Sequence, residues 1–201
     1  MKYFIVGLHS SGKQEVCDIL QNMGVKYGRN FSNIDIQSEY IYNCNNYELY
    51  SDKDINDIFE NNAYVFMQEL PLTEKVGGIK KYFEGLSKYT LDHNDVFILS
   101  PDQLLSVIPN SINDEVCFVW LDNTKNNRYS RYHEERRNYN FYFRDGLERK
   151  DIGSFVKNLY TFNNSNILYF TNEEPSRVAT IIYTLINRPE LKELYISNFN
   201  N

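Results

Sequence analysis

Short apolar segments alternate along the chain with segments in which apolar residues recur every three or four positions. The short segments are dominated by apolar residues, as in strands buried on both faces of a parallel sheet, and comprise residues 3–6, 95–99, 116–121 and 166–170. Helical periodicity follows the first of them and returns near the C-terminal end. Strands that alternate with helices imply βαβ crossovers, so the pattern predicts an α/β fold with a parallel sheet of about five strands and helices on both faces.

Cap residues mark one end of the first and of the last predicted helix. The first helix ends at Gly24, a favoured C-terminal cap, and its apolar stripe comprises Val16, Cys17, Ile19, Leu20 and Met23. The last helix starts near Glu174, with Pro175 in its first turn. We expect it to pack four apolar side chains against the sheet, namely Val178, Ile181, Ile182 and Leu185.

The segment between the first helix and the second apolar run mixes polar and aromatic residues. We expect a strand at residues 47–50 and another at residues 64–70. Between them, residues 51–61 are expected to form a helix capped by Ser51, with three side chains inward, namely Ile55, Ile58 and Phe59. Residues 79–91 are expected to be helical.

Composition narrows the class of protein. The chain has 201 residues, 42% of them hydrophobic, which suits a single domain spanning residues 1–201. A net charge of −6 and a pI near 5.2 argue against a general nucleic-acid binder, because affinity for a phosphate backbone needs a basic surface. Three cysteines without metal-ligand spacing fit a reducing compartment. Without a signal peptide or a run of membrane-spanning length, a cytoplasmic protein with no membrane partner is expected.

The first apolar segment leads directly into Gly7-Leu8-His9-Ser10-Ser11-Gly12-Lys13-Gln14. This stretch matches the phosphate-loop pattern G-x-x-x-x-G-K-[ST], except that Gln14 replaces the hydroxyl residue that normally contacts magnesium. In such a loop the backbone N–H groups, including those of Ser10 and Ser11, point at phosphate oxygens, and Lys13 and the helix N-terminus neutralise charge. The stretch therefore predicts a phosphate-binding site. A plain strand-to-helix turn, with glycines serving only backbone geometry, is the alternative.

Arginines cluster between residues 124 and 150 of an otherwise acidic chain: Arg128, Arg131, Arg136, Arg137, Arg144 and Arg149. One interpretation is a lid whose guanidinium groups close over transferring phosphates, with Gly146 as a hinge. The alternative is a solvated helix face paired with Glu134, Glu135 and Glu148.

Asp102 follows the apolar segment that ends at Leu99. A carboxylate just beyond the carboxyl end of a parallel strand faces the ligand crevice of an α/β fold. Capping of the following helix is an equally good account of this residue.

The order of these parts resembles the guanylate kinase family of P-loop nucleoside monophosphate kinases. After the loop, Tyr47-Glu48-Leu49-Tyr50-Ser51 and Gln68-Glu69-Leu70 are similar to that family's small nucleotide-binding insert, expected here near residues 28–78. The likeness continues through the segments that start at residues 95 and 116, the arginine-rich lid, and Phe170-Thr171-Asn172-Glu173 before the last helix. It spans nearly the whole chain.

On the donor side, the resemblance implies that ATP and Mg²⁺ bind at the loop. Lys13 would hold the donor phosphates, Gln14 and Asp102 would stand near the metal, and Asn172 would line the adenine pocket. The lid would supply the catalytic arginines, namely Arg128, Arg131, Arg136, Arg137 and Arg144.

On the acceptor side, the resemblance implies that Tyr47 and Arg29 contact the acceptor phosphate and that Glu69 accepts hydrogen bonds from a guanine-like base. Asp102 is also placed near the acceptor. The family's insert usually carries a second arginine after the first, whereas this chain has Ser32 at that spacing. An altered acceptor nucleotide would account for this departure.

The implied activity is transfer of the ATP γ-phosphoryl group to a nucleoside or deoxynucleoside monophosphate, with (d)GMP as the model acceptor. The rival is a catalytically silent nucleotide-binding or protein-interaction module, in which Gln14 marks the loss of metal-dependent transfer. A kinase for another small metabolite or for a polynucleotide end is a third option, and the acidic charge argues against an extended nucleic acid. His9 and His133 are expected to be bystanders. The oligomeric state stays open, with a homodimer as one arrangement.

Overall fold

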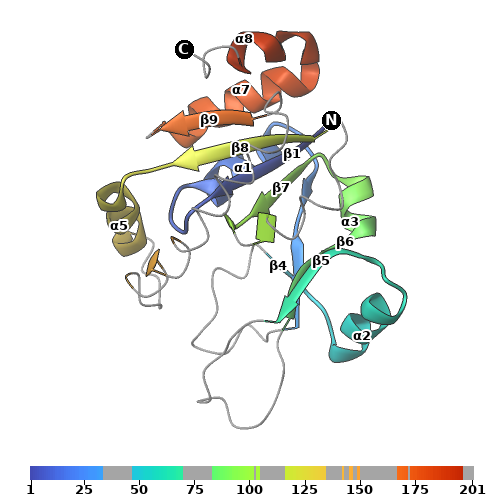
Figure 1. Cartoon of the computed structure of the whole chain (residues 1–201). Coiled ribbons are helices and arrows are strands. Elements are labelled where there is room, and N and C mark those ends of the chain that lie inside the picture. Colours follow the sequence, from blue (N-terminus) through green and yellow to red (C-terminus); the bar gives the residue numbers. More distant parts are fainter. Residues whose placement is uncertain are drawn as a thin grey trace.

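The computed structural model describes residues 1–33, 47–69, 83–101, 103–104, 116–134, 142, 145–146, 149, 167–171 and 173–196. Five strands form a central sheet: β1 (Lys2–Gly7), β2 (Tyr27–Gly28), β7 (Val96–Leu99), β8 (Val116–Asp122) and β9 (Ile167–Thr171). Their order is β2-β7-β1-β8-β9 and every pair is parallel (Figure 1). The predicted parallel sheet of five strands is therefore confirmed.

The two faces of β1 pack against different layers. Tyr3 and Ile5 point into a core shared with α1 (Lys13–Asn22) and α7 (Pro175–Asn187). Phe4 and Val6 point to the opposite side, where Phe66 and Leu86 of a second sheet cover the strand. All four β1 side chains are buried, which explains why the strand is an unbroken apolar run in the sequence.

Helix α1 ends at Asn22, and the predicted glycine cap, Gly24, follows two residues later. The Val25 N–H donates to the Leu20 carbonyl and the Gly24 N–H donates to the Gln21 carbonyl, both at 3.0 Å, and Gly24 has a φ of 88°. These two bonds form a Schellman motif, which favours glycine because of the positive φ. Met23, the last residue of the predicted apolar stripe, is 39% exposed, whereas Val16, Cys17 and Leu20 of that stripe are buried.

The C-terminal part also follows its pattern. Val178, Ile182 and Leu185 of α7 are buried and Ile181 is partly buried against the same core, as predicted. After α7 come a 3₁₀ turn, η2 (Pro189–Leu191), and α8 (Lys192–Ile196). Within the described ranges, no helix combines the length and the apolar character needed to cross a lipid bilayer.

A second sheet of four strands lies beside the central one (Figure 1). It consists of β3 (Asn30–Ser32), β4 (Tyr47–Leu49), β5 (Tyr64–Glu69) and β6 (Phe83–Ser87), in the order β4-β3-β6-β5. β3 runs parallel to β4 and antiparallel to β6, which is antiparallel to β5. The strands predicted at residues 47–50 and 64–70 are confirmed, and the sheet extends to Ser87, past the expected end of the insert.

The helix predicted over residues 79–91 was wrong for residues 83–87 and is confirmed for residues 88–91. Residues 83–87 form β6 between β3 and β5, and a helix, α3 (Lys88–His93), starts only after Ser87. A Cβ on Gly85 would lie 2.4 Å from the Phe66 carbonyl oxygen and 2.5 Å from a ring carbon of Phe31, so glycine allows three strands to meet here. The Ser87 side chain accepts from the Thr90 N–H and caps α3.

Helix α2 (Asp52–Glu60) carries the expected N-terminal cap. Ser51 and Asp54 exchange side-chain and backbone hydrogen bonds in a capping box. Ile55 is buried, but Phe59 is 60% exposed and stacks on Tyr64 at a centroid distance of 6.4 Å, so its predicted inward position was wrong. α5 (Lys125–Glu134) follows β8 and begins the described part of the arginine-rich segment.

Candidate functional site

The loop between β1 and α1 has the backbone that a phosphate loop requires. Ser10 and Gly12 both have positive φ, 54° and 91°, so the chain turns sharply before the helix begins. A Cβ on Gly7 would lie 2.7 Å from the Leu121 carbonyl oxygen, so glycine is needed for close contact with β8. The N-cap of α1 is Gly12, which supplies no side-chain cap, so the helix start is open to an anion.

The Lys13 side chain folds back over this loop. Its Nζ donates to the carbonyl oxygens of Gly7 and Leu8 at 2.6 and 2.8 Å. The ammonium group is therefore held beside the loop, where it can neutralise the charge of a bound phosphate.

Gln14 points along α1. Its Nε2 donates to Asp18 Oδ1 at 2.6 Å, and its Oε1 accepts from the Tyr27 hydroxyl at 3.3 Å. The amide thus links the first turn of α1 to β2. The predicted contact of Gln14 with a metal stays a prediction, and it requires the side chain to exchange these partners.

Arg128 is the most deeply buried charged residue in the described part of the arginine-rich segment, with no exposed surface. Its Nη2 donates to Asp145 Oδ1, its Nε to the Asn123 carbonyl at 3.3 Å and its Nη1 to the His9 carbonyl at 3.4 Å. In this arrangement Arg128 joins α5 to the loop backbone and does not reach solvent. A charge so deeply buried needs such partners, because desolvation would otherwise be costly.

Asp145 gathers further cations. Arg149 Nε lies 3.0 Å and Lys125 Nζ 3.7 Å from Asp145 Oδ2. Burial raises the pKa of the Asp145 carboxyl, but hydrogen bonds and charge from Arg128 and then Arg149 outweigh it, so the pKa lies below its usual value. Sequence reasoning missed Asp145, because seventeen residues separate it from Arg128 and no spacing rule links them.

Arg131 is better placed to meet a ligand. It is partly exposed, and its Nη1 donates to Glu15 Oε2 at 2.6 Å in the first turn of α1. Its guanidinium lies next to Gly12, 3.2 Å from where a Cβ of that glycine would stand. The remaining predicted lid arginines, Arg136, Arg137 and Arg144, lie outside the described residues.

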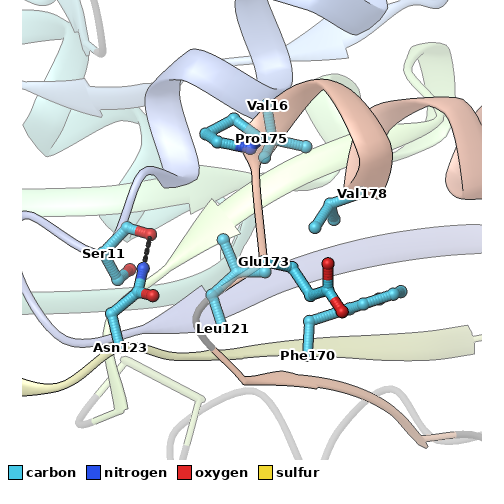
Figure 2. A pocket seen from close by; sticks show the side chains of 8 residues that line it. All are labelled: Ser11, Val16, Leu121, Asn123, Phe170, Glu173, Pro175 and Val178. Carbon is cyan, nitrogen blue, oxygen red and sulfur yellow. Dashed lines mark hydrogen bonds between the residues drawn. The ribbon is translucent and has the colours of Figure 1, made fainter.

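A small pocket opens between the loop, the carboxyl end of β8 and the start of α7 (Figure 2). It is lined by Ser11, Val16, Leu121, Asn123, Phe170, Glu173, Pro175 and Val178. Asn123 Nδ2 donates to the Ser11 carbonyl at 2.7 Å, which fixes the loop to the segment after β8. Asn172, the predicted adenine-pocket residue, lies outside the described residues, although its neighbours Thr171 and Glu173 are described.

In the second sheet, the polar contacts centre on Glu84, which sequence reasoning missed. Glu84 is 7% exposed and accepts three hydrogen bonds, from the Tyr47 hydroxyl at 2.9 Å, Gln68 Nε2 at 2.6 Å and Gln103 Nε2 at 2.7 Å. The predicted residue Tyr47 thus belongs to this cluster. A glutamate followed by glycine gives no strand signal, and only the pairing of β6 with its neighbours places this carboxylate inside.

The other predicted acceptor residues do not gather at one point. Glu69 is exposed at the end of β5. Ser32 is buried and its hydroxyl donates to the Phe83 carbonyl at 2.9 Å. Arg29 is half-buried between β2 and β3. Burial raises the pKa of the Tyr27 hydroxyl well above its usual value, and the charge of Arg29 lowers it by a smaller amount. Asp102 lies outside the described residues.

No family model matches the chain, and no curated protein matches it in sequence. Among solved structures it is similar to guanylate kinase from Anaplasma phagocytophilum over 97% of this chain and 88% of that one, with a TM-score of 0.53 and 11% identity. Shikimate kinase from Acinetobacter baumannii, in complex with shikimate, matches over 94% of each chain with a TM-score of 0.42 and 12% identity. At such identities the likeness concerns the fold. The parallel sheet, its glycine loop and the guanylate kinase match together give this chain the α/β fold of the P-loop kinases.

Proposed function

We propose that this protein transfers the γ-phosphoryl group of ATP to a small acceptor bound between the central and second sheets. The observation that carries the proposal is the loop from Gly7 to Lys13, which combines positive φ angles, an open helix N-terminus and a lysine ammonium held at the loop. The acceptor implied by the family resemblance is a nucleoside or deoxynucleoside monophosphate such as (d)GMP.

The residues would act mainly by position and charge. The loop N–H groups and Lys13 bind the donor phosphates, and Arg131 lies beside Gly12, where it can approach the same oxygens. Arg128 acts indirectly: it ties α5 to the His9 carbonyl and to Asp145, so that the lid starts from a fixed point. Closing of the lid would exclude water and align acceptor and donor.

A magnesium ion at this site would have few ligands from the protein. Among the described residues, no three His, Cys, Asp or Glu side chains gather to hold an ion. Mg²⁺ bound to phosphates keeps several waters and uses one or two protein oxygens, so a single Gln14 or Asp102 contact would suffice. When bound, the ion would neutralise charge on the transferring phosphoryl group.

A catalytically silent nucleotide-binding module is the second candidate. It is favoured by the engagement of Gln14 with Asp18 and Tyr27, which gives both ends of the amide a protein partner. In that case the loop would bind ATP without transfer.

The test measures ADP formation from ATP with a panel of nucleoside and deoxynucleoside monophosphates, with and without Mg²⁺. The kinase proposal expects ADP formation that depends on acceptor, on Mg²⁺ and on Lys13, and Gln14→Ser is expected to preserve or raise it. ATP binding that is equal with and without Mg²⁺, together with no transfer to any acceptor, would support the silent module instead.

A further inference from the structure

One face of the second sheet is polar and buried. Asn30 pairs with Tyr47 in register, and Ser32 and Gln68 both pair with Glu84, so these five side chains share a face, which we call the polar face. Asn30, Ser32 and Glu84 are each less than a tenth exposed. Buried polar groups in such number commonly serve a ligand or bound water.

The polar face meets the central sheet beside the loop. Gln103 Nε2 binds Glu84, and Gln103 Oε1 accepts from the Ser100 N–H at 2.9 Å, directly after β7. Asn30 Nδ2 donates to the Ile98 carbonyl within β7 at 3.3 Å. Because Leu99 lies opposite Val6 in register, both links reach the carboxyl edge of the sheet next to the loop that begins at Gly7.

Hydrogen-bond acceptors are left over on this face. The Glu84 carboxylate has about four lone-pair positions, and described residues fill three of them, namely Tyr47, Gln68 and Gln103. Asn30 Oδ1 is buried and has no hydrogen-bond partner in the part of the chain that the structure describes. A ligand with O–H or N–H donors would therefore satisfy both the Glu84 carboxylate and Asn30 Oδ1.

The charge of this region disfavours a phosphate. Residues 30–87 contain ten Asp and Glu but only four Lys and no Arg, a net charge of −6. All three described hydrogen-bond donors to Glu84 are neutral, and no described residue forms an ion pair with this carboxylate. A phosphate dianion brings only acceptors and negative charge, and a buried like charge would repel it.

We infer that the polar face binds an uncharged, hydroxyl-bearing acceptor of the nucleoside class, so that a hydroxyl and not a phosphate receives the phosphoryl group. This inference rests on the proposed phosphoryl transfer and changes its acceptor. In the reaction, the acceptor oxygen bonds to the γ-phosphorus while the bond from that phosphorus to the β–γ bridging oxygen breaks. ADP leaves with the electron pair, and the hydroxyl proton passes to water.

The decisive variant is Glu84→Gln, which removes the charge and keeps the contacts. The new amide oxygen can still accept from Gln68 and Gln103, and its NH₂ group can donate to the Tyr47 oxygen. Glu60→Gln, on the exposed end of α2, makes the same change of charge in the same region away from the polar face.

The experiment compares adenosine, guanosine, cytidine and uridine with their 5′-monophosphates, by calorimetric titration of wild type and both variants. For the wild type, the tightest nucleoside should bind at least about tenfold more strongly than its monophosphate. Glu84→Gln should reduce this ratio at least about threefold, since it removes the repulsion, and Glu60→Gln should leave it unchanged. A monophosphate that binds the wild type as tightly as its nucleoside overturns the inference, as does an unchanged ratio in Glu84→Gln.

A second measurement needs only the wild type, so it decides the question if Glu84→Gln does not fold. The protein is given ATP, an isotope-labelled nucleoside and an equimolar amount of the unlabelled 5′-monophosphate, and mass spectrometry identifies the products. Formation of labelled nucleoside monophosphate supports the inference, and formation of unlabelled diphosphate alone overturns it while upholding the kinase proposal. If no acceptor is phosphorylated, the kinase proposal fails, and the titrations still test the ligand class.

Discussion

The central sheet and the second sheet differ in what their strands bury. β1 and β8 bury apolar side chains on both faces, whereas the second sheet buries a row of amides and hydroxyls around Glu84. Their charges differ as well: residues 30–87 carry the whole net charge of −6, and the rest of the chain is balanced. Under the proposed function, this difference means that the loop between β1 and α1 attracts phosphates, whereas the second sheet binds an uncharged part of a ligand.

The largest effect on the loop side is expected from Arg128→Met. It leaves the buried Asp145 carboxylate with only the half-exposed Arg149 and Lys125 as cationic partners, so the free energy of unfolding should fall by about 3 kcal/mol, the lower end of the cost of breaking a buried ion pair. Urea denaturation measures this. Arg177→Met, which removes an exposed ion pair with Glu173, should cost less than about 1 kcal/mol. A similar cost in both variants would mean that the buried pair contributes no more than a surface one.

Acid should weaken the same pair. The pKa of Asp145 is lower in the folded protein than in the unfolded chain, so its stabilising contribution is present above the unfolded value of 3.8 and is lost as the pH falls through the folded value. The difference in unfolding free energy between wild type and Asp145→Asn should therefore be constant near neutral pH and shrink below about pH 4. A difference that stays constant down to pH 2 would contradict the depressed pKa.

Lys13→Ala tests the phosphate half of the comparison. Removing the ammonium at the loop should lower phosphoryl transfer at least about a hundredfold, on the order of 2.7 kcal/mol of transition-state stabilisation, without unfolding the protein. Steady-state kinetics measures the loss, and Lys26→Ala, an exposed lysine before β2, serves as the control. Turnover close to that of wild type would remove Lys13 from the site.

Ser51→Ala should loosen the second sheet alone. The change removes the capping box of α2 and should cost about 1 kcal/mol. Hydrogen exchange should speed up in α2 and leave α1 unchanged, if the two regions open separately. Equal acceleration in both helices would show that they open as one unit.

The smallest effect compares two residues with positive φ, one in each region. Ser10 in the loop has a φ of 54° and Asn62 after α2 a φ of 49°. Asparagine tolerates this conformation better than serine, so Ser10→Gly should stabilise by up to about 1 kcal/mol and Asn62→Gly by less. Thermal unfolding ranks the two, and a larger gain at Asn62 would contradict the order.

The parts of the fold that could be predicted are those in which one short segment determines its own structure. The run from Val116 to Leu121 is buried on both faces and apolar throughout, and Gly24 ends α1 through local backbone geometry. β6 could not be predicted in this way, because Glu84 and Gly85 become strand residues only through pairing with β3 and β5.

The same distinction between local and long-range contacts applies to the candidate site. The loop was evident because all its groups lie between Gly7 and Gln14. The partners of Arg128 and Glu84 come from distant segments. Asp145 and Gln103 are identified only by these contacts, which hydrophobic periodicity in the sequence does not predict. The family resemblance directed attention to Glu69, which the structure places at an exposed strand end. It did not point to the buried carboxylate of Glu84 on the adjacent strand β6, which pairs in register with Gln68.

Two buried thiols can report the rate at which the core opens. Cys17 of α1 and Cys117 of β8 are fully buried, and burial raises the pKa of the Cys117 thiol to about 12 and that of Cys17 well above its usual value. Since the thiolate is the reactive form, an aromatic disulfide reagent should modify them only during transient exposure. The modification rate then measures how often the core around α1 and β8 opens. A slower rate in the presence of ATP would measure how much the bound nucleotide stabilises the closed state of this core.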